Sequence, residues 1–514
     1  MIAPTDSPSA ATSPVPTAPA ASALPAAPSN ARRDAAASRQ PSPTLVPQIS
    51  PPPPHAPSAA PPIWIGPALS QPAARQYRLR AVFECGKLDP QVADTPVLAP
   101  FPLMLAPSAW QEVARLAEAL SSEAIAAERE LLARTDLHRT LALPRAVRRA
   151  LSRCTPPSAD SGPRLSRLDL HWAADDESPA IPAWRLSEIN ADVPGGLIEA
   201  GPLARLMLDI GGPPLGRAAL APDPGAALAY ALALRLRDSA ATDPLVALVH
   251  ATAYADDFQV MRRAQHCLNA VGLRSVLAAP DHLAWQTPGQ APMHAPTGQR
   301  VDAVIRFFPA EWLPQLGRRN RWERFFGPPE PSTRSTPAVL LSNPATAVLV
   351  QSKRWSLLWD RLTTPVPTWR QLLPETRDPR ELRPRRQLRP VGHPRTPSTA
   401  ASAHWVLKPA MGRVGEGVLV PGVASPHERA LRRAARRDPA SWVAQRRFHS
   451  IPLDSPVGPL HVCLGVYVVD GRAAGLYARA STRALIDQAA YELPVLIDHS
   501  ATQTTPNWSP HDRA

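Results

Sequence analysis

Lysine is nearly absent from this sequence. Of the 56 basic residues only Lys87, Lys353 and Lys408 are lysines, and all the others are arginines. The formal net charge of +13 would ordinarily suggest a nucleic-acid or anionic partner. Replacement of Lys by Arg throughout a chain is typical of a biased genome, so the charge alone does not establish such a partner. The three remaining lysines are candidates for places where only a compact ammonium fits.

Cysteine and long apolar runs are also scarce. The four cysteines, Cys85, Cys154, Cys267 and Cys463, form no CxxC pair, so we expect free buried thiols in a reducing compartment. No uncharged apolar run reaches the length of about 18 residues that suggests a membrane span, and the first residues lack the apolar core of a secretory signal. These features predict a cytoplasmic protein with no membrane partner.

Proline, in contrast, is abundant, with 66 residues. Residues 1–75 are almost entirely Ala, Pro, Ser and Thr, with too few large apolar side chains to offset the entropy of ordering, so we expect a disordered arm. Residues 373–402 are dense in Pro and Arg and are expected to form a surface insertion without regular structure. The tail from residue 499 to 514 is expected to be loose.

The folded part is expected to begin near Tyr77, with a strand that runs into a turn (RLRAVFECGKLDP). Apolar residues then recur at three- and four-residue spacing from 107 to 135, which predicts a long helix with Ser108 as its cap. A shorter helix over 144–153 follows. Two strands, 165–172 and 183–190, are predicted to pair in antiparallel fashion through an acidic turn.

From residue 244 strand and helix patterns alternate, which predicts an α/β unit with a parallel sheet. Its strands carry LVALVHA, LRSVLAA, VDAVIRFFP and AVLLSNP, with a helix over 256–271. A helix over 347–362 is predicted next. After the insertion come a short basic helix and strands around HWVLKPA, VLV, WVAQRRF, VCLGVYVVDG and RAAGLYARAS. We therefore expect three folded segments: 76–240, 241–345 and 346–498.

The strongest local signal is WVLKPAMGRVGEGVLV, in which a strand ends with Lys408 and a loop with Gly412, Gly415 and Gly417 leads to a second strand. The Walker pattern differs, because there the lysine follows the glycines and precedes a helix. A glycine-rich hairpin can lie over nucleotide phosphates, with backbone donors near the oxygens and lysine as a point charge. The alternative is a structural hairpin that needs glycine at its turns.

Lys353 begins the more polar half of the predicted helix after AVLLSNP. A helical lysine is usually only solvated. Two of the three lysines, however, lie beside the two segments that look most like nucleotide contacts, which favours a functional role for both.

The two acidic strands supply oxygen ligands in Asp169, Glu188 and Asn190. Alternation along a strand places Glu188 and Asn190 on one face, and Arg167 and Asp169 likewise share a face of theirs. Mg²⁺ prefers such hard oxygen ligands, with phosphates and water completing its shell. The alternative is the polar outer face of a hairpin.

Arginines are too frequent here to be informative singly. Arg479, in LYARAS, stands out only because its strand would lie close to the glycine-rich hairpin. The basic runs RPRRQLRP and RALRRAARR lack interleaved aromatic residues, so we predict no nucleic-acid partner.

Taken together, these segments resemble the circularly permuted ATP-grasp proteins related to the synthetase domain of glutathionylspermidine synthase, from about Arg78 to Asp498. In that family the metal-binding acidic strands precede the lysine strands, and RLD and EINAD precede SNP…SK and VLKPAMGRVGEG here. The resemblance implies an α+β or α/β chain with a circularly permuted ATP-grasp fold and a pre-ATP-grasp, Rossmann-like domain, behind the disordered N-terminal arm.

The resemblance also implies a role for each matching residue. Asp169, Glu188 and Asn190 would hold one or two Mg²⁺ ions that bridge the ATP phosphates. Arg167 and Arg479 would stabilise the transferred phosphoryl group and the acyl intermediate. Contacts with ATP, including a mobile flap over the phosphates, would come from Lys353, Lys408, Gly412, Arg413, Gly415, Gly417 and Gln445.

The implied activity is an ATP- and Mg²⁺-dependent ligase. ATP would phosphorylate a substrate carboxylate, and an amine would displace phosphate from the acyl phosphate to leave an amide. The partners would be a small-molecule or peptide carboxylate and an amine acceptor, and relatives suggest a homodimer. The alternatives are a non-catalytic nucleotide-binding protein with the same fold, or a scaffold that acts through the proline-rich arm.

Three features depart from the family pattern. The flap reads GRVGEG instead of GREG, and the spacing from Asp169 to Glu188 is longer than usual, which the acidic turn can absorb. No amidase segment with a catalytic Cys and His precedes the ligase region in this sequence, so a bifunctional enzyme is not expected.

Overall fold

The computed structural model describes residues 61–154, 162–174, 182–237, 242–285, 291–327, 339–382, 404–413, 415–423 and 427–499. All of these described residues belong to one compact unit. The expectations for most of the arm, for the greater part of the insertion and for nearly all of the tail lie outside the described residues. None of the described helices combines the length and apolar character that a membrane crossing requires.

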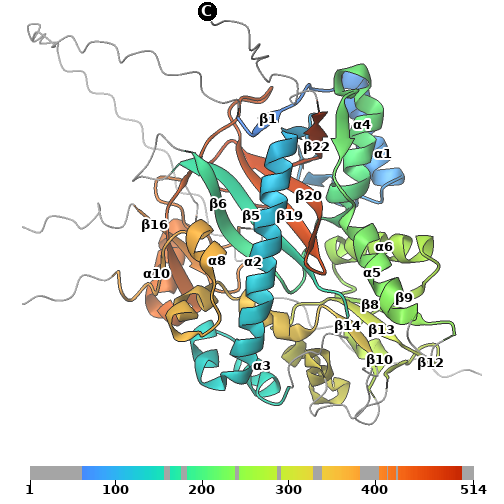
Figure 1. Ribbon diagram of the computed structural model, residues 1–514, viewed down its shortest axis with the longest axis vertical. Helices are drawn as coiled ribbons and strands as arrows, with labels where there is room; N and C mark the ends of the chain where they lie inside the picture. Colours follow the sequence, from blue (N-terminus) through green and yellow to red (C-terminus); the bar gives the residue numbers. More distant parts are fainter. Residues whose placement is uncertain are drawn as a thin grey trace, which may run out of the picture. The chain divides into compact units, whose positions relative to one another are not determined.

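A six-stranded antiparallel sheet lies at the centre of this unit (Figure 1). Its order is β18-β5-β19-β20-β21, and β6 pairs with β5. The two predicted acidic strands and the two predicted strands near residues 461–481 are confirmed, and they share this sheet although they are far apart in sequence. The strands are β5 (Leu165–Ala174), β6 (Ala183–Asn190), β18 (His449–Ser450), β19 (His461–Val469), β20 (Arg472–Ser481) and β21 (Tyr491–Leu493).

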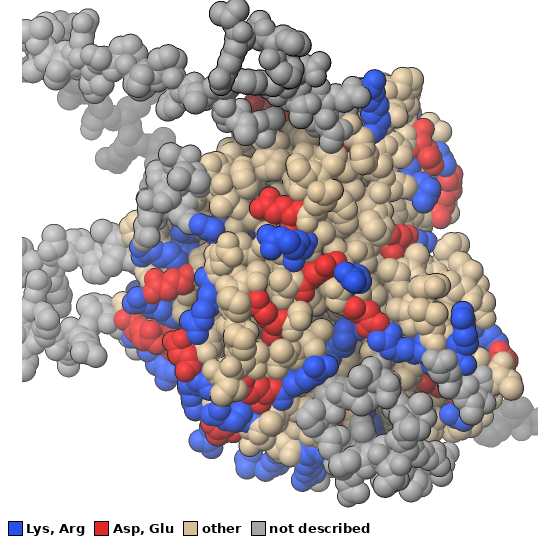
Figure 2. Space-filling view, viewed as in Figure 1, with Lys and Arg blue, Asp and Glu red and all other residues tan. Residues whose placement is uncertain are grey.

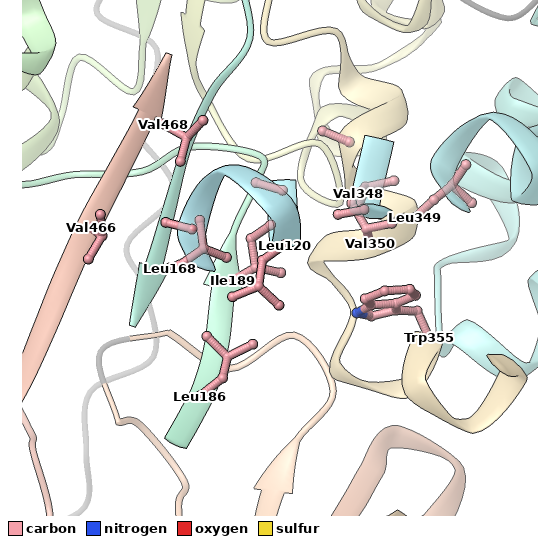
Figure 3. Close-up of a cluster of buried hydrophobic side chains, with 14 of the residues drawn as sticks. Leu120, Leu168, Leu186, Ile189, Val348, Leu349, Val350, Trp355, Val466 and Val468 are labelled. Atoms are coloured by element: carbon pink, nitrogen blue, oxygen red, sulfur yellow. The ribbon is translucent and has the colours of Figure 1, made fainter. Parts of the chain in front are cut away.

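Helix α2 (Pro107–Ala133) runs across one face of the central sheet (Figure 1). Leu168 of β5 and Leu120 of α2 are fully buried in one apolar cluster, which Figure 3 shows in close-up. Because side chains alternate across a strand, the odd-numbered residues of β5 face away from this helix. The predicted long helix is confirmed, but Ser108 is not its cap: the N-cap is Ala106, without a side-chain hydrogen bond, and Pro107 occupies the first turn.

A parallel sheet of order β14-β13-β8-β9 forms the predicted α/β unit. Helices α5 and α6 cover it with Leu228, Val260 and Leu268, which are buried in a second apolar cluster with strand residues. The prediction for this region is therefore confirmed. The elements are α5 (Pro224–Arg237), β8 (Leu245–His250), α6 (Ala255–Ala270), β9 (Arg274–Ala278), β13 (Ala303–Phe307) and β14 (Leu340–Ser342).

A three-stranded sheet of order β15-β17-β16 carries Lys408. Residues 373–402 were predicted to lack regular structure. This was wrong for the first residues of the segment, because Thr376 and Arg377 pair with Gln445 and Ala444. The predicted strand VLV is reduced to one bridge between Leu407 and Leu419. The elements are β15 (Thr376–Arg377), β16 (Trp405–Pro409), α10 (Glu428–Arg437) and β17 (Trp442–Arg446).

The first described residues fold differently from the prediction. The strand expected near Tyr77 is helix α1, because Tyr77 and Ala81 are buried at a spacing of four residues, which puts them on one side of a helix. Part of the predicted arm is folded too, since β1 pairs with β4 in a sheet of order β1-β4-β22-β7. The elements are β1 (Ile63–Ile65), α1 (Gln71–Phe83), β4 (Leu103–Leu105), α4 (Ala204–Gly211), β7 (Ala218–Leu220) and β22 (Val495–Asp498).

The helix predicted over 347–362 is broken at Ser352 into α7 (Val348–Gln351) and the 3₁₀ helix η9 (Lys353–Arg361). The Ser352 hydroxyl accepts the N–H of Arg354 and donates to the Leu141 carbonyl at 2.7 Å. Side-chain bonds of this kind compete with a continuous helix and start a new one instead. The break places Lys353 at the first position of η9.

On the face shown in Figure 2, basic and acidic side chains are interspersed among the described residues.

Short helices and strands complete the described structure. The short elements are β2 (Gln91–Val92), β3 (Thr95–Pro96), α3 (Arg145–Leu151), β10 (Leu283–Ala284), β11 (Met293–His294), β12 (Gln299–Arg300) and α8 (Pro367–Leu372).

Buried polar side chains fix the loop after β6. Asp192 is fully buried, is ion-paired with Arg306 of β13 and accepts the N–H of Ala310 at 2.9 Å. Asn343, after β14, accepts the N–H of Leu165 at 2.8 Å and donates to the carbonyl of Leu165 at 2.7 Å. These contacts join the parallel sheet to the end of the central sheet that carries the acidic strands.

Replacing Arg306 by alanine should destabilise the fold by about 3–5 kcal/mol, because Asp192 would remain buried with only the more distant Arg413, 3.9 Å away, as a cationic partner. Urea unfolding followed by circular dichroism measures this change. The matched control is Arg80→Ala, which removes the half-exposed pair with Glu84 on α1 and should change stability much less. Equal losses in both variants would contradict the role given to the buried pair.

Candidate active site

A cavity of about 760 Å³ opens between the central sheet, the β15-β17-β16 sheet and the parallel sheet. Its wall brings together residues that are up to about 400 positions apart in the chain, and among the predicted site residues only Gly417 is not part of it. The predicted residues that line it are Arg167, Asp169, Glu188, Asn190, Lys353, Lys408, Gly412, Arg413, Gly415, Gln445 and Arg479.

The two acidic strands place their carboxylates side by side. Asp169 of β5 lies directly opposite Glu188 of β6, and Arg167 lies opposite Asn190. A bulge follows, since Leu170 pairs with Leu186 and Ser187 has no partner in the register. The extra residue lets Leu186 and Ile189 both face the core while Glu188 and Asn190 face the cavity.

Asp169 is held by two neighbours. Arg167 donates Nε to Oδ1 at 2.7 Å and Nη2 to Oδ2 at 3.0 Å, a bidentate pair that fixes the carboxylate plane. The Asn190 amide nitrogen Nδ2 donates to Oδ2 of Asp169 at 3.0 Å. The Asn190 amide oxygen Oδ1 is thereby left available to a cation. Arg167 itself is fixed by the Gly195 carbonyl at 2.9 Å and lies over the Tyr477 ring.

Glu188 has Lys353 as its partner, with Nζ 2.9 Å from Oε2. Burial alone would raise the pKa of Glu188, but Lys353, with Lys408 and Arg167 behind it, holds that pKa below its ordinary value. Lys353 also donates to the Gly412 carbonyl at 2.8 Å, and its backbone N–H donates to Ala410. One ammonium therefore links an acidic strand to the glycine-rich loop.

Lys408 is buried at the end of β16. Its Nζ donates to Gln445 Oε1 at 2.6 Å and to the carbonyl of Ser187, the bulged residue, at 3.2 Å. Burial lowers the pKa of Lys408 to about 8, although Glu188 acts in the opposite direction. Lys408 and Gln445, each predicted to contact ATP, are thus in direct contact, across the pair of strands β16 and β17.

The glycine-rich loop follows β16 and reaches the far wall of the cavity. Gly415 has φ of +71°, and a Cβ there would overlap the carbonyl oxygen of Ile486, so a larger residue does not fit. Arg413 is ion-paired with Glu311 at 2.7 Å and lies over the Trp312 ring. Gly417 packs against Pro409 with φ of +70°, so its place is in the turn. Val414 lies outside the described residues.

Arg479 lines the cavity from β20 and donates Nη2 to the Asp487 carbonyl. Its neighbours on β19 and β21 are Cys463 and Glu492. Burial raises the pKa of Cys463 well above its ordinary value, which keeps this thiol protonated and unsuited to act as a nucleophile.

The residues that sequence reasoning missed lie mostly on loops and edge positions. Tyr477 and Glu492 carried no motif, and their approach to the site depends on packing between distant segments. Val406 and Phe448 are apolar residues that line the cavity with Lys408. Their sequence pattern indicated strands and gave no sign of a role in the site. Lys87 had been singled out as a rare lysine, but its surroundings were not predictable from its neighbours in sequence.

The acidic pair fits a divalent cation chemically. Directly opposed carboxylates repel each other unless cations lie between or beside them. The two carboxylates and the free Oδ1 of Asn190 make the hard oxygen set that Mg²⁺ prefers. Within the described ranges no three His, Cys, Asp or Glu residues form a metal-binding group. The predicted set here has two carboxylates and one amide.

Comparison with solved structures gives the fold. A glutathione synthetase-like effector from Globodera pallida, in its apo form, aligns with 82% of this chain and 96% of its own at 10% identity, with a TM-score of 0.55. A putative gamma-glutamylcysteine synthetase from Methylobacillus flagellatus KT aligns with 73% of this chain and 87% of its own at 10% identity, with a TM-score of 0.31. At such identity the first similarity concerns the fold alone.

Comparison with curated proteins found no match. Comparison with family models found one that covers residues 105–498 and is described as glutathionylspermidine synthase pre-ATP-grasp. The matched residues include both acidic strands, both lysines of the cavity and the glycine-rich loop. The chain therefore belongs to the glutathionylspermidine synthase pre-ATP-grasp family.

Proposed function

We propose that the protein is an ATP- and Mg²⁺-dependent carboxylate–amine ligase with a circularly permuted ATP-grasp fold. The observation that carries the proposal is the convergence, in one cavity, of an opposed pair of carboxylates, two lysines and a glycine-rich loop. The family to which the chain belongs is named for a synthase that forms an amide, which supports the same reaction class.

The adenine end of the cavity would be at Lys408 and Gln445. Val406, Val420 and Phe448 offer apolar surfaces there, while the Gln445 amide and the Ser187 carbonyl offer polar atoms. A planar base between apolar side chains, with a few fixed polar contacts, is the usual composition of a cofactor site.

The phosphates would lie between Lys353, Lys408 and the loop from Gly412 to Gly417. Lys408 is buried and the Lys353 side chain is only 10% exposed, so their attraction to phosphate is stronger than in water. Asp169, Glu188 and Asn190 would hold Mg²⁺, which supplies charge neutralisation at the transferred phosphoryl group. Binding would require Glu188 to share its carboxylate between Lys353 and the cation.

The chemical step needs positioning more than a protein nucleophile. A substrate carboxylate oxygen attacks the γ-phosphorus, ADP leaves, and an amine then displaces phosphate from the acyl carbon. Arg167 and Arg479 would face the charge that develops on the phosphoryl and acyl oxygens, as fixed cations in the cavity wall. Closure of the glycine-rich loop on residues near Ile486 would exclude water from the acyl phosphate.

The second candidate is a non-catalytic nucleotide-binding protein. The observation in its favour is the related fold in a protein described as an effector. Product formation separates the candidates, because both require ATP binding and only the ligase releases phosphate when a carboxylate and an amine are present.

Mg²⁺-dependent ATP binding is the first test. Isothermal titration calorimetry should give micromolar binding by the wild type, and Lys408→Ala should weaken it by about 10–100-fold, the contribution of a charged hydrogen bond. Thermal unfolding checks that the variant is folded. A well-folded wild type that binds no ATP would contradict both candidates.

The affinity for ATP should fall by about tenfold between pH 7 and pH 9. Lys408 has a pKa near 8 in the free protein, so its ammonium is mostly lost over this range and the attraction to phosphate goes with it. Lys408→Arg is the matched control, since arginine stays charged throughout. A pH dependence of equal size in this variant would show that Lys408 is not the titrating group.

Substitution of the acidic strand residues should remove turnover without unfolding the chain. Glu188→Gln and Asn190→Ala are expected to lower ATP-dependent phosphate release by about 10²-fold or more, as for other fixed groups at a transition state. Glu112→Gln, on the exposed side of α2, is the control. Full activity in either site variant would refute the assigned roles, and circular dichroism would identify an unfolded one.

A further inference from the structure

Lys87 is the third lysine of the chain, and the proposed site does not use it. It follows the C-terminus of α1, where its backbone N–H donates to the Ala81 carbonyl at 3.0 Å. Only 1% of the residue is exposed. A lysine so deeply buried is rare unless anionic partners compensate its desolvation.

Three carboxylates supply that compensation. The Lys87 ammonium hydrogen-bonds Glu199, and it lies 2.7 Å from Asp89 Oδ1 and 2.8 Å from Glu492 Oε2. They come from three segments far apart in sequence: the turn after α1, the π-helix η2 (Glu199–Leu203) and strand β21. A compact ammonium with three donors can serve three converging carboxylates, whereas a planar guanidinium cannot take its place.

All three carboxylate residues line the cavity, whereas Lys87 lies behind them. Three acidic groups against one ammonium leave this part of the wall with surplus negative charge. The part adjoins the proposed reaction centre, because Glu492 of β21 is the direct neighbour of Arg479 on β20. It is separate from the proposed nucleotide end at Lys408 and Gln445.

Glu492 is held firmly but incompletely bonded. Its backbone is fixed on both sides, since its N–H donates to the Val97 carbonyl at 2.7 Å and its carbonyl accepts the N–H of Ala99 at 3.0 Å. Its Oε2 is buried, and within the described part of the chain no donor is aligned with it, although Lys87 Nζ is within ion-pair distance. The ion pair with Lys87 thus holds Oε2 on the inner side of the wall, and Oε1 is the oxygen that Glu492 can offer to the cavity it lines.

The charges around Glu492 act in opposite directions. Lys87 favours its ionised form, while Glu199 of η2 and Asp89 oppose ionisation. Tyr77 of α1, and Tyr477 and Arg479 of β20, complete the titratable and charged groups on the neighbouring elements. Burial, together with Glu199, raises the pKa of Glu492 to about 7, near the value at which a proton acceptor is most effective at neutral pH.

We propose that Glu492 accepts the proton that the incoming amine must lose, and that Lys87 is the positioning residue that holds Glu492 beside Arg479. The inference rests on the proposed ligase function. An amine arrives as an ammonium, and transfer of one N–H proton to Oε1, the Glu492 oxygen that is not turned toward Lys87, frees the nitrogen electron pair. The nitrogen then bonds to the acyl carbon, the bond from carbon to the phosphate oxygen breaks, and the departing phosphate takes the second proton from nitrogen.

Two acceptors distinguish this role from a structural one. The family name supplies two of the probes, glutathione as the carboxylate and spermidine as an amine that is protonated at neutral pH. The second acceptor is hydroxylamine, which is largely unprotonated at neutral pH. Glu492→Gln should lower amide formation with spermidine by about 10²-fold, within the range for a lost general base. Hydroxamate formation, which needs no such base, should fall far less, and Glu112→Gln should match the wild type with both acceptors.

Lys87→Met should act in the same direction and should also move the pH profile. The acidic limb of the rate with spermidine, near pH 7 in the wild type, should shift upward, because loss of the ammonium makes Glu492 harder to ionise. A purely structural role would lower both products equally and leave the limb in place. That result, or unchanged amide formation in Glu492→Gln, overturns the proposal.

Thermal unfolding as a function of pH tests the protonation of Glu492 without enzyme turnover, so it also applies to variants that are inactive for other reasons. In the folded protein Glu492 keeps its proton up to about pH 7, whereas in the unfolded chain it ionises near its ordinary value. Between the ordinary pKa of glutamate, 4.5, and about pH 7 the native state thus binds more protons than the unfolded chain. The free energy of unfolding must therefore fall as pH rises through this range. The melting temperature of the wild type should therefore fall relative to Glu492→Gln between pH 5 and pH 8, and parallel curves overturn the proposal. A wild type that binds ATP but forms neither product instead refutes the ligase function on which the proposal rests.

Discussion

The direct opposition of Asp169 and Glu188 across β5 and β6 is the constraint on which the site depends. Two neighbouring carboxylates in a desolvated wall repel each other, so each needs a cation. Arg167 serves the first and Lys353 the second, and Lys353 also holds the glycine-rich loop through the Gly412 carbonyl. Neutralising one pair of charges thereby connects the central sheet to the loop that would cover a nucleotide.

The scaffold makes this opposition rigid. Helix α2 buries one face of the central sheet, so the alternating residues of β5 have no freedom to turn away from the cavity. The bulge at Ser187 shifts the alternation of β6 by one residue, so that Glu188 faces the cavity beside Asp169, and it turns a backbone carbonyl toward Lys408. Fixed strands carry the charged groups, whereas the glycine-rich loop supplies the part that would need to move.

Much of the fold followed from periodicity. Strands β5, β6, β19 and β20, helix α2 and the parallel sheet were predictable because their apolar patterns are long and regular. Helix α1 was missed, since a mixed run of Arg, Leu and Ala reads equally as a strand until the burial of Tyr77 and Ala81 is known. The break at Ser352 and the bulge at Ser187 depend on tertiary hydrogen bonds, which no local pattern encodes.

Of the site, the rare lysines and the acidic strands were recognisable because few residue types can do their chemistry. The Lys87 cluster was not, because Asp89, Glu199 and Glu492 meet only when three distant segments pack together.

The most direct test of the central claim is a crystal structure with Mg²⁺ and a non-hydrolysable ATP analogue. The account predicts Mg²⁺ on Asp169 and Glu188, with the phosphates beneath the loop from Gly412 to Gly417. A nucleotide bound elsewhere, or an intact Lys353–Glu188 pair with no cation beside it, would contradict it.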